Sequence, residues 1–205
     1  MRGAPRAQIV RRQRPEGRAA KPLKVVVTGP FAAGKTSLIQ TISDVTVLGT
    51  ERTISDDTRS TKESTTVAMD FGRIEMGDLS LFLFGTPGQK RFEVMWEILS
   101  EGMIGFVLLV NAADERSASE AAAQLETFRR YADVPFVVGV THLDAPGASL
   151  EEVSDRLDLV DSVPVVACDP RSRADVKDLL LGILFAVLDR LDTAAGAEAV
   201  PAAAS

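Results

Sequence analysis

One segment near the amino end constrains the fold more than any other, because it joins an apolar run to a glycine loop and a helix-forming run. Residues 29–36 read GPFAAGKT, which matches the pattern GxxxxGK[ST]. Residues 23–28 before it are typical of a buried strand, and residues 37–42 after it can continue as a helix. In this order the three parts form a phosphate cradle, in which backbone N–H groups and the positive helix end face the anion. The sequence therefore predicts a nucleoside triphosphate site here.

Roles within this loop follow from the same pattern. Lys35 is expected to reach the β- and γ-phosphates and so to take part in catalysis, and the Thr36 hydroxyl is expected to ligate Mg²⁺. The other loop residues expected to contact the nucleotide are Gly29, Pro30, Phe31, Ala32, Ala33, Gly34 and Ser37.

Charge is distributed unevenly along the chain. The net charge of the 205 residues is −6, yet residues 1–22 hold seven basic side chains against one acidic one, which leaves −12 for the remainder. An acidic body argues against nucleic acid as the main ligand.

The ends of the chain differ from its centre in composition. Residues 1–22 are basic and rich in proline and glycine, and residues 193–205 are rich in alanine, so both segments are expected to be disordered. The basic arm either makes a peripheral contact with an anionic membrane or an acidic partner, or is a solvated tail or an incorrectly assigned start. Residues 23–192 are expected to form one domain.

No secretory or membrane-spanning pattern is visible. The basic cluster is not followed by an apolar core, and the longest apolar run, residues 179–188, is too short to cross a bilayer. Cys168 is the only cysteine, so no intramolecular disulfide can form. A cytoplasmic location is expected.

Apolar runs alternate with amphipathic segments. Strands are predicted at residues 23–28, 106–110, 136–140 and 163–166, and helices at residues 115–131, 150–157 and 173–191. Residues 66–71 and 79–84 flank a polar turn and suit a hairpin. These patterns predict an α/β, three-layer sandwich whose six-stranded sheet is mostly parallel with one antiparallel edge strand.

A second motif follows the strand at residues 79–84. Residues 85–92 read GTPGQKRF, which resembles the DxxGQ switch of Ras-like small GTPases. By this resemblance the Gly88 N–H approaches the γ-phosphate and Gln89 orients the attacking water. Gly85 replaces the family's Asp, which holds a magnesium-bound water, so a carboxylate is missing. Asp114 either substitutes for it or caps a helix.

This departure, with the Thr-Pro-Gly-Gln that follows, is similar to bacterial Ras-like GTPases of the gliding-polarity and actinomycete conservon type. The resemblance covers about residues 23–191 and implies a P-loop NTPase fold, GTP/GDP and Mg²⁺ as cofactors, and slow GTP hydrolysis in a signalling switch. It also implies a roadblock-type regulatory partner and a sensor-kinase system. The surface around Phe92, Met95 and Trp96 would face such a partner, unless Trp96 simply packs its helix on the sheet.

Base recognition is expected at the ends of two later strands. Residues 141–144 read THLD, in place of the guanine-reading [N/T]KxD, so Asp144 would accept hydrogen bonds from guanine N1–H and the exocyclic amine. Thr141 replaces the family's Asn, and His142 either stacks on the base or is structural. Ala167 and Cys168 begin the segment that matches Ser-Ala-Lys. There the Cys168 N–H would contact guanine O6, or the cysteine is simply buried.

Two roles remain for the polar stretch before residue 71. By resemblance Thr66 would give its hydroxyl to Mg²⁺ and its N–H to the γ-phosphate, with Thr65 as the alternative and a strand-forming role as a third. Arg52 or Arg59 would either stabilise the transition state in cis or be solvated. Two other functions stay open: a GTP-binding interaction module with negligible hydrolysis, and a P-loop ATPase.

Overall fold

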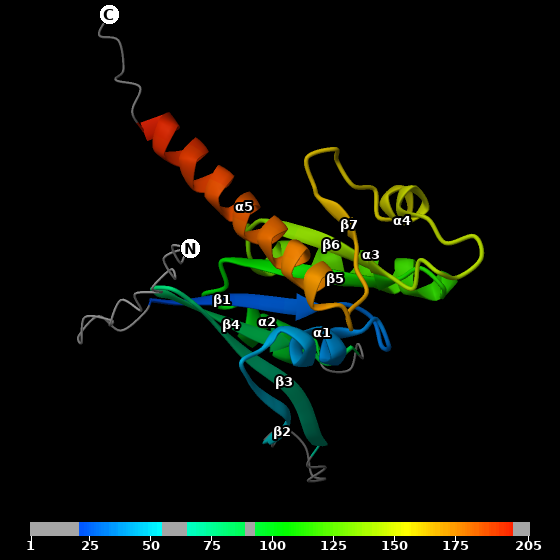
Figure 1. Ribbon diagram of the computed structural model, residues 1–205, viewed down its shortest axis with the longest axis horizontal. Coiled ribbons are helices and arrows are strands. Elements are labelled where there is room, and N and C mark those ends of the chain that lie inside the picture. Colours follow the sequence, from blue (N-terminus) through cyan, green and yellow to red (C-terminus); the bar gives the residue numbers. More distant parts are fainter. Residues whose placement is uncertain (1–20, 55–64, 89–92, 199–205) are drawn as a thin grey trace, which may run out of the picture.

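A seven-stranded sheet forms the centre of the computed structural model, which describes residues 21–54, 65–88 and 93–198 (Figure 1). The strands lie in the order β2-β3-β4-β1-β5-β6-β7. Their bounds are β1 Lys21–Thr28, β2 Val45–Ile54, β3 Thr65–Met76, β4 Leu79–Gly85, β5 Gly105–Asn111, β6 Phe136–Thr141 and β7 Val165–Ala167.

The predicted α/β fold class is confirmed, and the sheet differs from the expectation in two details. It has seven strands in place of six, and the antiparallel strand β3 lies second from the edge, between β2 and β4. The additional strand is β2, in the polar stretch before β3. Val45, Val47 and Leu48 give this edge strand an apolar start, but the following residues read GTERT, and because of this polar half the strand was missed.

Five helices flank the sheet in the described ranges. They are α1 Lys35–Ile42, α2 Glu93–Ser100, α3 Glu115–Tyr131, α4 Leu150–Arg156 and α5 Arg173–Glu198. Helix α5 corrects one expectation, since residues 193–198 continue this helix and are not a disordered tail. Residues 199–205 and residues 1–20 of the basic arm lie outside the described ranges. Within those ranges, no helix combines the length and apolarity that a bilayer crossing requires.

The core has two halves, one on each face of the sheet. Helices α1 and α5 cover one face, and α2, α3 and α4 cover the other (Figure 1). Strand β1 serves both, because successive side chains of a strand point to opposite faces: Val25 and Val27 pack toward α1 and α5, and Val26 packs toward α3.

Parallel pairing positions the site. Strand β1 pairs in parallel with β4 and β5, and β5 pairs in parallel with β6. The carboxyl ends of these strands therefore meet at one edge of the sheet, where ligands bind in open α/β folds. The glycine loop, the Gly85–Gly88 segment and the residues that follow β6 all leave the sheet at this edge.

The buried phenylalanine of α3 provides a test of the core. Phe128 is fully buried, with its ring centroid 5.9 Å from that of Trp96 and 5.3 Å from that of Phe106. Phe128→Ala should lower the free energy of unfolding by about 3–5 kcal/mol, measured by urea denaturation followed by circular dichroism. Phe185→Ala is the matched control, because Phe185 is 61% exposed on α5. Equal losses in the two variants would contradict this packing.

Candidate functional site

The loop between β1 and α1 lies closely against neighbouring residues at both ends, the β5 backbone at Gly29 and the Pro170 ring at Gly34. A Cβ on Gly29 would lie 2.3 Å from the Leu109 carbonyl oxygen of β5, and one on Gly34 would lie 2.8 Å from Pro170 Cγ. Both glycines also have positive φ, at 144° and 99°. Only glycine meets both demands, so the loop is held closely against β5 and the segment before α5.

Lys35 lies inside this loop. It is 9% exposed, and its Nζ donates to the carbonyl oxygens of Gly29 at 2.7 Å and Pro30 at 2.6 Å. Burial lowers the pKa of the ammonium to about 8, although the Asp70 carboxylate acts in the opposite direction. A cation with so few partners is suited to an anionic ligand at the mouth of the loop.

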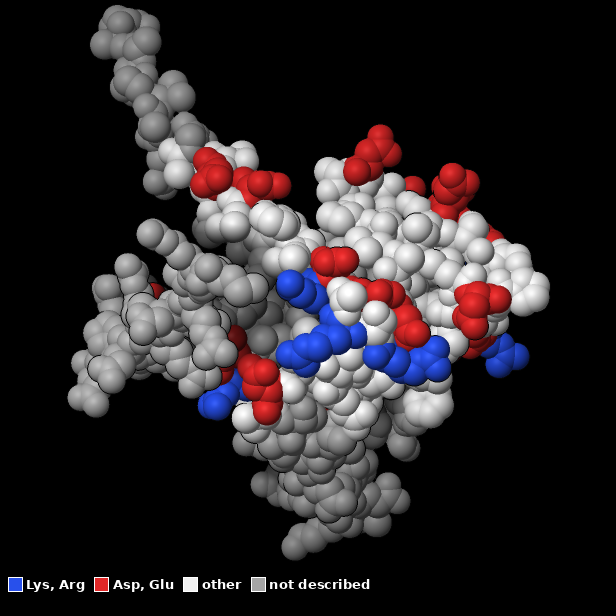
Figure 2. Space-filling view, viewed as in Figure 1, with Lys and Arg blue, Asp and Glu red and all other residues white. Residues whose placement is uncertain are grey.

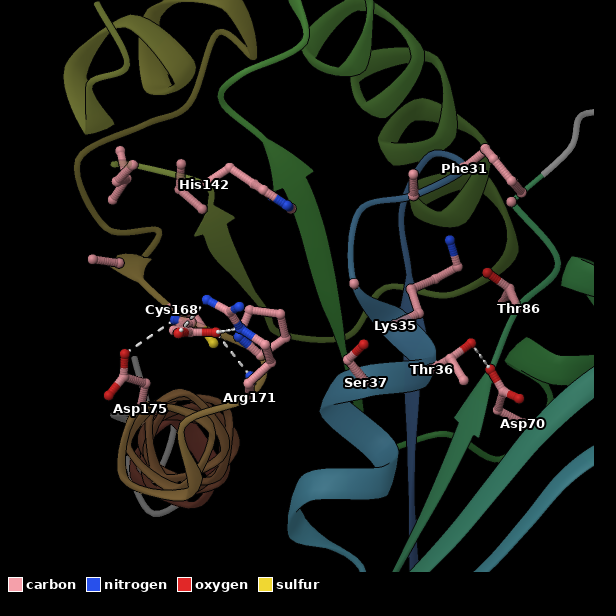
Figure 3. A pocket seen from close by; sticks show the side chains of 18 of the residues that line it. Phe31, Lys35, Thr36, Ser37, Asp70, Thr86, His142, Cys168, Arg171 and Asp175 are labelled. Carbon is pink, nitrogen blue, oxygen red and sulfur yellow. Dashed lines mark hydrogen bonds and ion pairs between the residues drawn. The ribbon is translucent and has the colours of Figure 1, made fainter. Parts of the chain in front are cut away.

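Asp70 is a carboxylate of the site that the sequence analysis missed. It lies on β3, and its Oδ2 accepts a 2.5 Å hydrogen bond from the Thr36 hydroxyl (Figure 3). In the β3–β4 pairing Asp70 is opposite Gly85, and a Cβ on Gly85 would lie 3.5 Å from Asp70 Oδ2. A carboxylate therefore lies on the neighbouring strand at the same level of the sheet as Gly85.

Asp114 does not lie at this place. Its side chain caps α3 by accepting from the Arg116 N–H at 3.0 Å, and it lines a separate depression between α3 and α4. Of the two roles expected for Asp114, the structure supports the helix cap.

Gly88 brings the segment after β4 into contact with the glycine loop. A Cβ on Gly88 would lie 2.8 Å from the Phe31 nitrogen and 2.9 Å from Lys35 Nζ. The absence of a side chain therefore allows two backbone segments to meet where the terminal phosphate is expected.

Several expected residues cannot be located in this way. Gln89, Phe92 and Arg59 lie outside the described residues. Thr66 and Arg52 lie in strands β3 and β2, where the structure describes the backbone at these positions but not the side chains. Thr66 is four residues before Asp70, or about 13 Å along an extended strand. The roles of these residues stay predictions.

At the other end of the cavity, Thr141 supports the loop from behind. It is fully buried, and its Oγ1 lies 3.3 Å from the Ala33 carbonyl oxygen and 3.2 Å from that of Val110. Thr141 thereby joins β6 to the glycine loop. His142 follows in the left-handed region, with φ of 58° and its Nδ1 2.9 Å from Thr141 Oγ1, and Asp144 lines the cavity beyond it.

Cys168 departs from the role expected of its main chain. Its N–H already donates to the Val140 carbonyl oxygen at 2.9 Å, so it is not available to a guanine O6 without loss of that bond. The side chain is buried, and burial together with Asp175 and Asp169 raises the pKa of the thiol to about 12. The structure favours the alternative of a buried structural cysteine that also lines the cavity.

Arg171 is a second residue that the sequence analysis missed. Its Nε and Nη2 each donate to one carboxylate oxygen of Asp169 at 3.0 Å. Asp169 stands at the position where the resemblance has Lys. Both residues line the cavity near Asp144. The base end therefore carries an exposed ion pair in place of a single lysine.

One open cavity of about 910 Å³ is lined by most of the glycine loop, by Asp70 and Gly88, and by Asp144, Cys168 and Arg171 (Figure 3). Lys35, Thr36, Asp70 and Thr86 lie toward one end, and His142, Cys168 and Arg171 toward the other. The volume suits a small organic ligand. Among the described residues no three His, Cys, Asp or Glu side chains gather as metal ligands. A cation at Thr36 and Asp70 would therefore need ligands from a phosphate and water.

The surface of the face in Figure 2 carries charges of both signs. Basic side chains gather near its middle and acidic ones lie directly beside them, so this face presents no extended field of one sign. Binding here depends on the local groups of the cavity.

Comparison with known proteins gives the family. The model of a family described as conserved hypothetical ATP-binding protein matches residues 27–189. The chain belongs to this family. The matched range includes the glycine loop, Asp70, Asp144 and most of α5.

Three curated proteins are also similar to this chain. It is 35% identical over 98 residues to an uncharacterized protein of Methanocaldococcus jannaschii, covering 48% of this chain and 56% of that protein. It is 24% identical over 186 residues to translation initiation factor IF-2 of Syntrophobacter fumaroxidans, covering 86% of this chain and 18% of the factor. It is 29% identical over 98 residues to ADP-ribosylation factor-like protein 8b of Arabidopsis thaliana, covering 46% and 53%.

The chain thus spans about half of two of these relatives and under a fifth of the third. Together with the glycine loop between β1 and α1, the family match shows a nucleotide-binding protein with a P-loop NTPase fold.

Proposed function

We propose that this protein is a small GTP-binding switch that hydrolyses GTP slowly to GDP, of the bacterial Ras-like type found in gliding polarity and actinomycete conservons. The observation that carries the proposal is the shared cavity, which has Lys35, Thr36 and Gly88 at one end and Asp144 at the other. A nucleoside triphosphate needs both ends, because one holds phosphates and the other selects the base.

Asp144 supports guanine as the base. A carboxylate that follows β6 accepts hydrogen bonds from guanine N1–H and the exocyclic amine, and adenine offers no such pair of donors. The second candidate is ATP, which the family description favours. The engaged Cys168 N–H also favours it, because guanine O6 then lacks its usual donor.

Replacement of Asp144 tests the base. Wild-type protein should bind GTP more tightly than ATP in calorimetric titrations with Mg²⁺. Asp144→Asn should lose about 10- to 100-fold in GTP affinity and gain affinity for xanthosine triphosphate, since an amide offers a donor where the carboxylate only accepts. Asp192→Asn, an exposed site on α5, is the control. Tighter ATP than GTP binding by the wild type would replace GTP with ATP in this proposal.

Mg²⁺ is the second part of the proposal. Thr36 would ligate the ion through its hydroxyl oxygen, and the hydroxyl proton would remain available to Asp70, the partner it already has. Thr66 is proposed as a further ligand. An ion held by Thr36 and the nucleotide would supply positive charge that offsets the negative charge developing on the phosphates during phosphoryl transfer. Asp70 would orient Thr36, and it would also offer a carboxylate close to where an Asp at position 85 would hold a magnesium-bound water.

Substitutions at positions 70 and 85 test the role of Asp70. Dissociation of a fluorescent guanine nucleotide should be slowed by Mg²⁺ in the wild type, and Asp70→Asn should weaken the apparent Mg²⁺ affinity by about 10- to 100-fold. The double variant Asp70→Gly, Gly85→Asp should recover part of that loss. Rates in EDTA should be similar for all variants, and Asp114→Asn is the matched control. Unchanged Mg²⁺ dependence in Asp70→Asn would contradict the assignment.

Hydrolysis is the third part. Gln89 would orient water, and Lys35 would stabilise the phosphates. Sites of this kind without an arginine turn over at about 10⁻³ per second or less, and a supplied arginine adds about 10³- to 10⁵-fold. Arg52, Arg59 or a partner would supply it. A roadblock-type regulator and a sensor-kinase system are the proposed partners, and the cytoplasm is the proposed location.

Single-turnover assays test hydrolysis. Wild-type protein loaded with GTP should release phosphate slowly, and a roadblock-type partner should accelerate release. Gln89→Leu should abolish both rates while nucleotide affinity is retained, because leucine cannot orient water. Absence of turnover in the wild type under all conditions would favour the alternative, a GTP-binding interaction module.

A further inference from the structure

Buried polar side chains lie behind the Thr86–Gly88 segment. Thr28 at the end of β1 is fully buried, Thr86 is 4% exposed and Gln124 of α3 is 5% exposed. Polar groups this deep in a core need hydrogen-bond partners, so their arrangement follows from the partners that they have.

These side chains form one continuous series of hydrogen bonds. The Thr86 hydroxyl donates to Thr28 Oγ1 at 3.0 Å, and the Thr28 hydroxyl donates to Gln124 Oε1 at 3.3 Å. The Gln124 Nε2 in turn lies 3.5 Å from the Gly88 carbonyl oxygen, to which it donates. The series therefore begins and ends on the same segment.

Helix α2 holds Pro87, the residue between Thr86 and Gly88. The Trp96 indole Nε1 of α2 donates to the Pro87 carbonyl oxygen at 3.1 Å. Trp96 is 2% exposed, and its ring stacks on Phe128, so the indole is itself firmly placed. Two successive carbonyl groups, those of Pro87 and Gly88, are thus held by side chains of α2 and α3.

The planar peptide bond gives this arrangement a consequence for the site. In a trans peptide the C=O of one residue and the N–H of the next lie in one plane and point in opposite directions. No cis peptide occurs among the described residues. Because Trp96 holds the Pro87 carbonyl, the Gly88 N–H points away from α2. Gly88 itself lies against the nitrogen of Phe31 and Nζ of Lys35, at the phosphate end of the cavity.

We propose that Trp96 and Gln124 are positioning residues that hold the two peptides on either side of the Gly88 Cα, Trp96 through the Pro87 carbonyl and Gln124 through the Gly88 carbonyl, so that the Gly88 N–H is oriented to bind a terminal phosphate. This inference rests on the proposed switch function, because it concerns recognition of the γ-phosphate. Together with Thr28 and Thr86 the two residues form a switch clamp. The clamp orients the N–H before the nucleotide arrives, which lowers the cost of ordering this segment when a triphosphate binds.

The clamp favours the triphosphate over the diphosphate. Only the triphosphate has the phosphate group that the Gly88 N–H would meet, whereas both nucleotides use the loop and Lys35. Loss of a clamp contact should therefore change the ratio of the two affinities. A residue that only packed the core would lower both affinities together or leave both unchanged.

The test uses two variants that retain side-chain volume. Gln124→Met removes the amide, and Trp96→Phe removes the indole N–H but keeps a ring against Phe128. The dissociation constants for GDP and for a non-hydrolysable GTP analogue are measured by calorimetry with Mg²⁺. The preference for the analogue should fall about 10-fold in each variant, the loss expected for one hydrogen bond to a charged group. GDP affinity should change by less than about 2-fold, because no hydrogen bond to the diphosphate is lost.

Gln40→Met is the matched control, because Gln40 is exposed on α1. Its preference should equal that of the wild type. Preferences that stay at the wild-type value in both clamp variants would overturn the inference, as would equal losses for GDP and the analogue. If the protein proves to bind ATP, the same comparison is made with ADP and an ATP analogue.

The chain has a single tryptophan, so its fluorescence reports on the clamp directly. Wild-type emission should differ between the GDP and analogue complexes, and the difference should shrink in Gln124→Met. If the emission of the wild type is the same in the GDP and analogue complexes, the proposed switch itself is contradicted. If the emission of the wild type differs between the two complexes and that of Gln124→Met differs by the same amount, only the clamp is contradicted.

Discussion

The site depends on the close approach of backbone to backbone at the carboxyl edge of the sheet. The glycine loop lies against the Leu109 carbonyl through Gly29, and the segment after β4 lies against the loop through Gly88. Neither contact leaves room for a Cβ. Because the loop is held closely on both sides, its backbone and the buried Lys35 lie beside Gly88, and the remaining parts of the site are arranged around them.

The hydrogen bond from Thr36 to Asp70 then fixes the orientation of the Thr36 hydroxyl, which is the proposed magnesium ligand. The carboxylate comes from the antiparallel strand β3, and Gly85 of β4 leaves the space in which it lies. Compared with the Ras-like pattern, which has Asp at position 85, the carboxylate here lies on the paired strand. Its Oδ2 atom reaches the Thr36 hydroxyl from residue 70. Substitution at either position bears on the other, because the two share one space.

Much of this could be predicted from the sequence where a strong local pattern exists. The strand, loop and helix around Lys35 were evident, and α3 has the predicted bounds, because its apolar spacing and its cap agree. Strand β2 was missed because its apolar start at residues 45–48 is followed by the polar residues GTERT. Asp70 was missed although the signal was present: a two-residue turn at Gly77 and Asp78 pairs Met76 with Leu79, and counting along both strands brings residue 70 opposite residue 85. The engaged N–H of Cys168 could not be predicted, because it depends on the register of β7 against β6.

The side chain at the tip of the glycine loop has a consequence of its own. Phe31 is 73% exposed, and its backbone nitrogen is the atom closest to the position a Gly88 side chain would take. A bulky ring therefore stands at the mouth of the cavity on the phosphate side (Figure 3). A partner that reached the proposed terminal phosphate from this side would contact the ring. The loop proposed to bind the phosphate would thus also contribute an apolar surface to such a partner.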